Sequence, residues 1–215
     1  MFSKISLIKP LALAALLATA GASQAAITVY TSLASFNAAT LVRGTDTFLG
    51  FSITGSSPSP VTRNAGPFTY TANASPAGSF FGGGTTANPF LSTNTATDFM
   101  TFSGFSAGVA GLGGNFFGSN VSGRFAAGGV TLTATDASGT TTQTIASATE
   151  SGFLGFVSNT GLLSATVTSV QPSTGFLWPS ADNLVLATVV PEPGTYAMML
   201  AGLGVLGFMA RRRRS

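Results

Sequence analysis

The residue types that most often perform covalent chemistry are scarce in this chain of 215 residues. It contains no His and no Cys, so a serine nucleophile would lack its usual base. Gly104, Ser106 and Gly108 match the spacing of a nucleophile elbow, but Lys4 and Lys9, the only lysines, both lie at the N-terminus. We therefore interpret this segment as the Gly-rich end of a strand, and we do not expect a hydrolase.

Carboxylates offer a second kind of chemistry. A glycosidase needs two of them across a cleft, and the sequence leaves open whether any two converge. Calcium binds Asp and Asn oxygens, so Asp182 with Asn183, or Asp136, could contribute ligands, but the chain has no calcium-loop spacing. We favour turn and capping roles and expect no metal or cofactor. The carboxylates between residues 27 and 188 are Asp46, Asp98, Asp136, Glu150 and Asp182.

Trp178 is the single tryptophan of the chain. An exposed indole face would suit stacking on a sugar ring, so Trp178 is a candidate glycan contact. The favoured interpretation is a ring packed at the edge of the fold beside Pro179, because large aromatic side chains mostly contribute buried area.

The elements that would position these side chains are mostly strands. Residues 31–40 predict one short helix, with Ser32 as its N-cap and Leu33, Phe36 and Ala39 on one face. Residues 130–135 alternate apolar residues with Thr, and a turn at 136–139 predicts a hairpin. Further strands are expected at 48–53, 68–71, 99–105, 153–157, 163–170 and 184–188, with long loops between weak strands over 52–89.

Many short strands separated by turns predict an all-β fold, a single jelly-roll-like β-sandwich with one short N-terminal helix, over residues 26–189. About 160 residues can bury a core without disulfides. Three arginines (Arg43, Arg63, Arg124) against five acids give this body a net charge of 3 − 5 = −2. It therefore lacks the basic patch that nucleic-acid binding requires.

The N-terminus has the order of a secretion signal. Lys4 and Lys9 precede an apolar run at 11–20, and small residues follow. The run is too short to span a bilayer. Residues 1–25 therefore predict a signal peptide, with cleavage between Ala25 and Ala26 by signal peptidase after passage through the secretion translocon.

The C-terminus carries three features in a fixed order. Two prolines break any helix at the segment Val190, Pro191, Glu192, Pro193 and Gly194. Residues 195–210 form an apolar run that predicts a short transmembrane helix. The cluster Arg211, Arg212, Arg213 and Arg214 then favours the cytoplasmic side, which places the body outside the inner membrane.

Gly202, Gly204 and Gly207 match the spacing of a dinucleotide fingerprint. They lie inside this apolar tail with no preceding strand, and glycine is common in membrane helices. We therefore reject a nucleotide cofactor.

Residues 190–215 resemble the PEP-CTERM sorting tail of Gram-negative bacteria, also labelled an "ice-binding protein C-terminal" domain, although that label is no evidence of ice binding. The resemblance implies recognition by an exosortase and cleavage near Glu192, and an association with exopolysaccharide or biofilm. A plain C-terminal anchor is the alternative. More loosely, segments 99–102, 111–116, 153–156 and 182–186 resemble the bodies of PEP-CTERM proteins, which supports a sandwich and implies no catalytic residues.

We therefore expect an exported protein without catalytic activity, held first in the inner membrane with its body in the periplasm. Its final place would be the cell surface or the extracellular matrix, in association with polysaccharide. Two alternatives stay open: a carbohydrate-binding module that uses Trp178, and a glycoside-active enzyme that uses two of the carboxylates.

Overall fold

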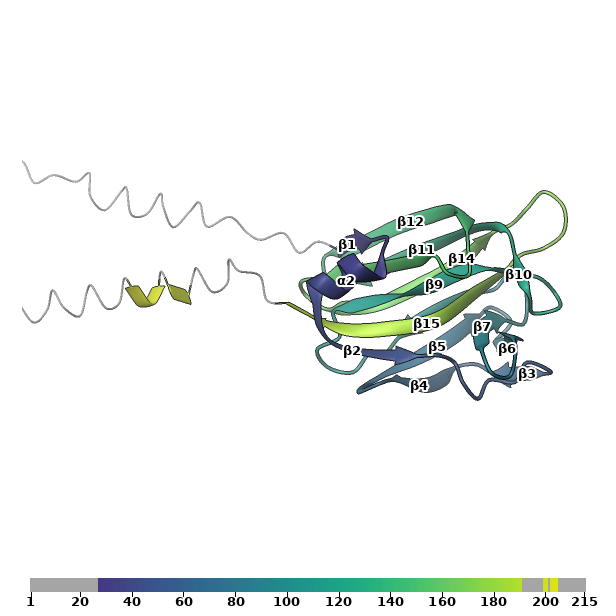
Figure 1. Ribbon diagram of the computed structural model, residues 1–215, viewed down its shortest axis with the longest axis horizontal. Coiled ribbons are helices and arrows are strands. Elements are labelled where there is room, and N and C mark those ends of the chain that lie inside the picture. The colour runs from purple at the N-terminus through teal and green to yellow at the C-terminus, as the bar shows by residue number, and fades with distance from the viewer. Residues whose placement is uncertain (1–26, 191–198, 201, 205–215) are drawn as a thin grey trace, which may run out of the picture.

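Two antiparallel sheets form the body in the computed structural model, which describes residues 27–190, 199–200 and 202–204 (Figure 1). The nine-stranded sheet has the order β1-β13-β9-β15-β7-β6-β3, with β10 also paired to β9 and β2 to β15. Its strands are β1 (Ile27–Tyr30), β2 (Thr40–Asp46), β3 (Ser56–Pro58), β6 (Ser79–Gly84), β7 (Pro89–Thr93), β9 (Gly111–Ser119), β10 (Phe125–Ala126), β13 (Phe153–Ser158) and β15 (Trp178–Val189).

The six-stranded sheet packs against the first and has the order β12-β11-β14-β8-β5-β4. One core lies between the sheets, and both contribute inward-facing side chains to it, such as Leu112 and Leu186 from one sheet and Leu132 and Met100 from the other. The expected sandwich is thus found as two packed antiparallel sheets, while its jelly-roll connectivity stays a prediction. The second sheet contains β4 (Val61–Ala65), β5 (Phe68–Ser75), β8 (Phe99–Ser103), β11 (Gly128–Asp136), β12 (Gly139–Ala148) and β14 (Leu162–Val170).

The single helix expected near the N-terminus is confirmed as α2 (Leu33–Ala39), and the Ser32 side chain caps it by accepting a hydrogen bond from the Ser35 amide at 3.2 Å. Phe36 is its buried residue and packs on the outer face of the nine-stranded sheet. Glycine makes this approach possible, since a Cβ at Gly155 would lie 2.6 Å from the Phe36 ring.

The hairpin expected around residues 136–139 is also confirmed. β11 and β12 pair from Gly128 to the turn, where Asp136 lies opposite Gly139. Outward-facing threonines on the two strands join in hydrogen-bonded pairs, such as Thr133 with Thr142 at 2.9 Å. Cross-strand pairs of this kind stabilise a solvent-facing sheet surface.

Three strand predictions need correction. Residues 48–53 form no strand, because Phe48 and Gly50 adopt φ values of 54° and 92° that turn the chain. The last strand begins at Trp178, six residues earlier than the expected start at Leu184. The Gly- and Ser-rich stretch 52–89 contains β3 to β6 and is not dominated by long loops.

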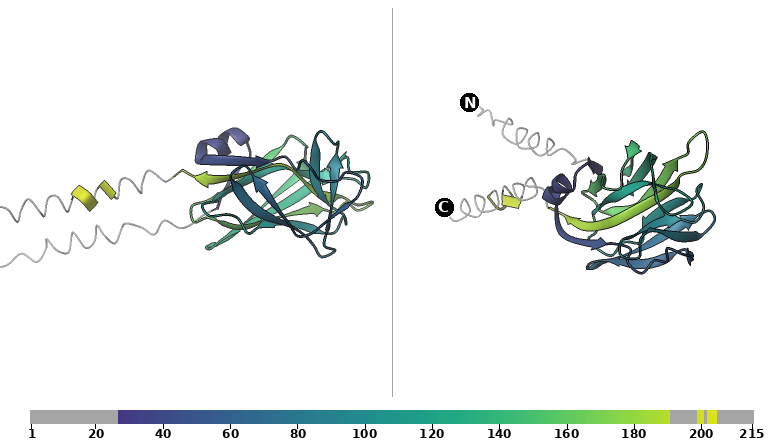
Figure 2. Two further views of the ribbon diagram at one scale, coloured as in Figure 1. Left: turned by 90° about the horizontal axis from the view of Figure 1, so that it is seen from below. Right: turned by 45° about the vertical axis from the view of Figure 1, so that its right-hand side comes forward.

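The first and last strands bring the two ends of the body together. Ile27 pairs with Ser158, and the neighbouring Val157, Gly111 and Ala187 form the adjoining row across β13, β9 and β15. Three strand spacings separate β1 from β15 at this end, which is about 14 Å. Both strands therefore meet the flanking segments at one end of the sandwich, and Trp178 lies at the other end (Figures 1 and 2).

The expected transmembrane helix, residues 195–210, lies largely outside the described residues. Within the residues that the structure describes, no helix has the length and apolar character needed to cross a membrane.

Candidate functional site

Strand β15 changes partners halfway along its length. On one side, Ser180 and Ala181 pair with β7, whereas Leu184 to Val189 pair with β2. On its other side a register shift against β9 falls between Asp182 and Val185. Asn183 and Leu184 thus lie opposite the single residue Gly114 in a β-bulge that directly follows Asp182, where the sheet divides. Bulges often re-aim side chains beside functional sites.

The bulge is built on a strained residue. Asn183 has a φ of 49°, a left-handed conformation that is uncommon for residues other than Gly. Its backbone amide donates to Asp182 Oδ1 at 2.7 Å, and its side-chain Nδ2 donates to Asn115 Oδ1 at 3.2 Å. Asn115 Nδ2 in turn donates to the Gly152 carbonyl at 3.2 Å. This chain of carboxamides connects β15 with β9 and with the turn before β13.

A pocket of about 670 Å³ opens over this bulge. Its lining comes from the β6–β7 hairpin, the middle of β9 and β15, and the turn between β12 and β13. Polar groups are numerous in it, and Phe90 and Phe117 supply its apolar part, with their rings 5.0 Å apart in an edge-to-face arrangement. The polar lining residues are Thr85, Asn88, Asn115, Glu150, Ser151, Asp182 and Asn183.

Two of the five carboxylates that the sequence offered therefore share one pocket, Glu150 and Asp182. Asp182 is only 8% exposed. Burial raises the pKa of its carboxyl above the ordinary value, the Asn183 amide lowers it, and the charge of Glu150 raises it further. A carboxylate in this state retains protons more readily than a solvated one.

Two other carboxylates have structural roles, and for Asp136 this is the turn role that the sequence predicted. Asp98 accepts hydrogen bonds from the Ala77 amide at 3.2 Å with both oxygens. Asp136 accepts from the Ser158 hydroxyl at 2.7 Å and from the Ser138 and Gly139 amides of its turn. The Ser158 bond lowers the pKa of Asp136, burial acts in the opposite direction, and the turn amides lower it further.

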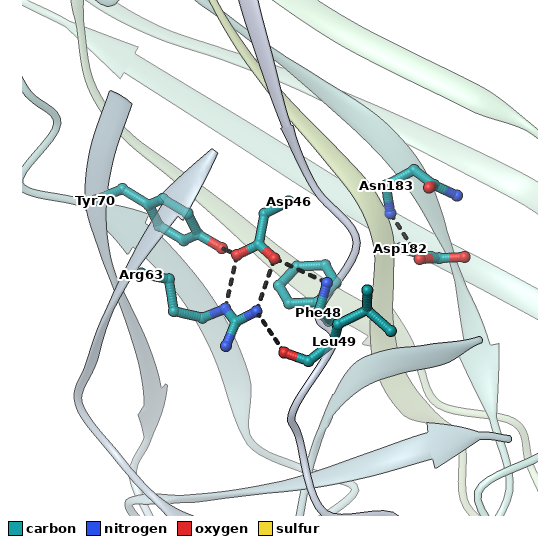
Figure 3. Close-up of polar contacts among 7 residues, drawn as sticks. All are labelled: Asp46, Phe48, Leu49, Arg63, Tyr70, Asp182 and Asn183. Carbon is teal, nitrogen blue, oxygen red and sulfur yellow. Dashed lines mark hydrogen bonds and ion pairs between the residues drawn. The ribbon is translucent and has the colours of Figure 1, made fainter. Parts of the chain in front are cut away.

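The remaining carboxylate, Asp46, forms the ion pair of the body. Arg63 binds it through Nε at 2.6 Å and Nη2 at 2.7 Å. The Tyr70 hydroxyl donates to it at 2.6 Å and the Phe48 amide at 2.8 Å. Figure 3 shows this cluster beside Asp182, whose only dashed contact is with Asn183. Asp46 is therefore saturated with donors and holds no free position for a ligand.

Trp178 is partly buried, and its Nε1 donates to the Asn94 carbonyl at 3.3 Å. The neighbouring Phe176 is 65% exposed, and the two rings lie 6.3 Å apart, edge to face. Gln171 fixes the base of their loop, because its side-chain amide exchanges hydrogen bonds with Leu177 N and O at 3.1 and 2.7 Å. Sequence reasoning identified Trp178 but not Phe176, which is the more accessible ring.

Ser106 does not occupy a nucleophile elbow. It follows the end of β8 in a loop, where its Oγ accepts from the Thr69 amide at 3.2 Å and its own amide donates to the Thr69 carbonyl at 2.9 Å. The interpretation of Gly104 to Gly108 as a strand end is confirmed.

The expected sorting segment begins where the sandwich ends. Val190 follows β15 directly, and its amide donates to the Ala39 carbonyl at 3.2 Å. Residues 189–214 match the model of the PEP-CTERM protein-sorting motif. The chain carries a PEP-CTERM sorting motif. No curated protein and no solved structure matches the chain.

The PEP-CTERM motif makes this an exported protein with a membrane-anchored intermediate before exosortase cleavage. The remaining residues of the motif segment, Pro191, Glu192, Pro193 and Gly194, lie outside the described residues, as do the arginines 211–214 and the cleavage pair Ala25 and Ala26. Their individual roles stay predictions.

Sequence patterns held partial signals for the pocket. Asp182-Asn183 interrupts an apolar strand pattern with two residues that disfavour strands, which could have indicated a bulge. Asn115 likewise is a residue type that disfavours strands, and it interrupts a Gly-rich strand. Nothing in the sequence linked either segment to Glu150 or to the β6–β7 hairpin, because only the sheet order brings those turns together.

Proposed function

We propose that this protein is a non-catalytic component of the cell surface or extracellular matrix, sorted by an exosortase and associated with exopolysaccharide or biofilm. The observation that carries the proposal is the PEP-CTERM motif, which starts at Val189, the last residue of β15. Cleavage near Glu192 would separate the tail without removing a strand from the sandwich.

The position of the chain ends supports the same route. The signal peptide and the sorting tail both join the body at one end, and β15 carries the chain about 36 Å to the opposite end at roughly 3.3 Å per residue. A body anchored in this way would present its far end, with Trp178 and Phe176, to the surroundings of the cell.

The absence of catalysis in this proposal rests on the state of the reactive groups. Asp46, Asp98 and Asp136 are each occupied by structural donors. Ser106 is bonded to backbone, and the chain has no His to act as its base.

Fractionation of cells with an antibody against the body tests the proposal. In a strain that makes exopolysaccharide, the processed protein should co-sediment with matrix, and in a polysaccharide-deficient strain it should move to the medium. An equal distribution in both strains would contradict the association. Glu192→Ala should leave the protein uncleaved in the inner membrane, as should deletion of the exosortase.

A carbohydrate-binding module is the second candidate, because the exposed Phe176 ring lies edge to face with the partly buried Trp178, beside a loop that Gln171 fixes. Aromatic faces are common sugar contacts, although the packing role of Trp178 is equally visible in its bond to Asn94. Glycan-array binding that disappears in Trp178→Ala and persists in Leu163→Ala, an exposed residue of the other sheet, would favour this candidate.

A glycoside-active enzyme is a third candidate, and Glu150 and Asp182, which line one pocket, are the carboxylates it would use. The raised pKa of Asp182 is a property that a general acid needs. Release of reducing sugars from a matrix polysaccharide, lost in both Glu150→Gln and Asp182→Asn, would support it and contradict the non-catalytic proposal.

A further inference from the structure

The pocket over the β15 bulge is rich in hydrogen-bond acceptors. Asp182 Oδ1 accepts from Asn183, but Oδ2 accepts no hydrogen bond from any residue that the structure describes. The same holds for Asn183 Oδ1 and for the Glu150 carboxylate within residues 27–190. Asp182 is largely buried, but Oδ2 is not among the buried side-chain atoms of the described residues that lack a partner, so it can accept a hydrogen bond from a ligand that enters the pocket.

The pocket also has an aromatic floor. Phe90 and Phe117 are almost fully buried and hold each other edge to face, so their position does not depend on a ligand. They line the base of the pocket and leave only a small apolar area open to a ligand, while Asn115 and Asn183 provide carboxamides from the neighbouring strands. Mixed apolar and polar lining in a volume of about 670 Å³ is typical of a small-molecule site.

The backbone at the pocket contains a residue in an uncommon conformation, Asn183. Asn183 adopts a left-handed conformation, which is uncommon for residues other than Gly and which Asn tolerates better than most. This bulge aims the Asp182 carboxylate into the pocket and brings the Asn183 side chain against Asn115. Strain of this kind clusters at ligand sites.

The charge of the pocket selects the ligand. Glu150 and Asp182 are its titratable groups, and no Arg or Lys is among the residues that line it in the described part of the chain. An anionic ligand would meet two carboxylates without a countercharge. Hydroxyl and ammonium groups, by contrast, would satisfy the free acceptors.

We propose that this pocket binds a neutral or amine-bearing saccharide through Asp182, Asn183 and Asn115, with Phe90 and Phe117 at its base. The assignment rests on the polysaccharide association proposed above and names its binding site, which is distinct from the Trp178 loop. Calcium is a weaker fit, because no group of three or more Asp, Glu, His or Cys residues within the described ranges is arranged to hold a metal.

Calorimetric titration of the full-length protein in mild detergent tests the assignment. The probes are hexasaccharides of three kinds: a panel of neutral glucans with different linkages, a chitosan hexamer and a polyuronate hexamer. We expect binding to members of the first two kinds and none to the polyuronate, with no change on addition of a calcium chelator. Preferred binding of the polyuronate, loss of binding in chelator, or no binding to any neutral or amine-bearing probe would overturn the assignment.

Matched variants locate the site. Asp182→Asn retains the bond from the Asn183 amide but changes the free acceptor, and it should weaken binding by about ten-fold or more, because hydrogen bonds to charged groups contribute about 1.5–3 kcal/mol. Asn183→Gly removes the carboxamide and relaxes the strained φ, so it should also weaken binding while the protein stays folded. Trp178→Ala should bind as the parent protein does, and the opposite pattern would place the site at the Trp178 loop.

The same variants separate this inference from the proposed function. If the parent protein does not co-sediment with matrix, the polysaccharide association is wrong. If the parent protein and Asp182→Asn co-sediment equally and bind the hexasaccharides equally, the association stands and only the pocket assignment fails.

Discussion

Asp46 and Asp182 lie on adjacent strands of the same sheet and differ in almost every interaction they make. Asp46, 5% exposed, pairs in register with Leu184, two residues beyond Asp182. It receives donors from Arg63, Tyr70 and Phe48, whereas Asp182 receives one, from Asn183 (Figure 3). The fold supplies the Asp46 carboxylate with a countercharge and donors, whereas one oxygen of the Asp182 carboxylate has no protein donor.

This contrast distinguishes a structural buried charge from one that is available to a ligand. Arg63 packs over the rings of Phe48 and Phe51 at 5.5 and 4.7 Å, so it covers the Asp46 side of the sheet. Burial lowers the pKa of Arg63, but the hydrogen bonds and charge of Asp46 outweigh burial and leave it raised. No cation approaches Asp182 within the described residues, which keeps its pocket acidic.

The largest expected effect comes from Arg63→Leu, which would leave Asp46 buried without its partner. Breaking a buried ion pair in this way destabilises a protein by about 3–5 kcal/mol, and the partial exposure of the Arg63 side chain, 18%, places this case near the lower end. Urea denaturation followed by circular dichroism measures the loss. Arg124→Leu is the control, because Arg124 is exposed and should change stability by less than about 0.5 kcal/mol. Equal stability of the two variants would show that Asp46 does not depend on Arg63 for its stability, and its contrast with Asp182 would fail.

A smaller loss is expected from Tyr70→Phe. The Tyr70 hydroxyl is buried and donates to Asp46 at 2.6 Å, so its removal should cost about 1.5–3 kcal/mol, the range for hydrogen bonds to charged groups. Ring packing against Phe102 is retained. The same denaturation measurement tests this, and a variant as stable as the parent would show that the other three donors suffice for Asp46.

How far these environments follow from sequence differs between the two residues. Ser32 as a helix cap and the Asp136 turn were predictable because caps and turns depend on neighbouring residues in the chain. The Asp46–Arg63 pair joins β2 to β4 in the opposite sheet, and the pocket joins β6, β9, β15 and the β12–β13 turn. Both depend on sheet order, which local patterns do not specify.

Residues 48–53 also show that local sequence patterns do not specify tertiary contacts. Their aromatic content predicted a strand, yet Phe48 and Phe51 are spaced to pack around Arg63 rather than to alternate across a sheet. Burial explains the aromatic residues, and the positive φ of Phe48 excludes the extended backbone. The membrane route, by contrast, was predictable from 26 contiguous residues, and the PEP-CTERM match covers them nearly in full.

Asp136→Asn should destabilise the protein at pH 7, whereas Asp182→Asn should stabilise it. Because the pKa of Asp136 is lowered in the folded protein, its ionised form stabilises the fold above the ordinary value of 3.8, and this contribution is lost as the pH falls through the lower folded value. Replacement should therefore destabilise the protein by about 1–2 kcal/mol at pH 7 and by less at pH 3. Thermal unfolding at both pH values measures the difference.

The smallest expected effect is a gain in stability, and it comes from Asp182→Asn. The pKa of Asp182 is raised in the folded protein, so its protonated form favours folding below the ordinary value of 3.8, and that contribution is lost as the pH rises through the higher folded value. At pH 7 the ionised carboxylate opposes folding. Asp182→Asn keeps the shape and the bond from the Asn183 amide without the charge, and it should stabilise the ligand-free protein by up to about 1 kcal/mol at pH 7.

The difference between Asp182→Asn and the parent protein should shrink as the pH falls toward 3, where both side chains are neutral. Thermal unfolding of the two proteins side by side at pH 7, 5 and 3 measures it. A variant that gains stability while losing saccharide binding shows that the fold retains an unfavourable charge for its ligand. If Asp182→Asn is instead destabilised at pH 7, as Asp136→Asn should be, Asp182 is a structural residue like Asp46, and the distinction between the closed and the open carboxylate fails.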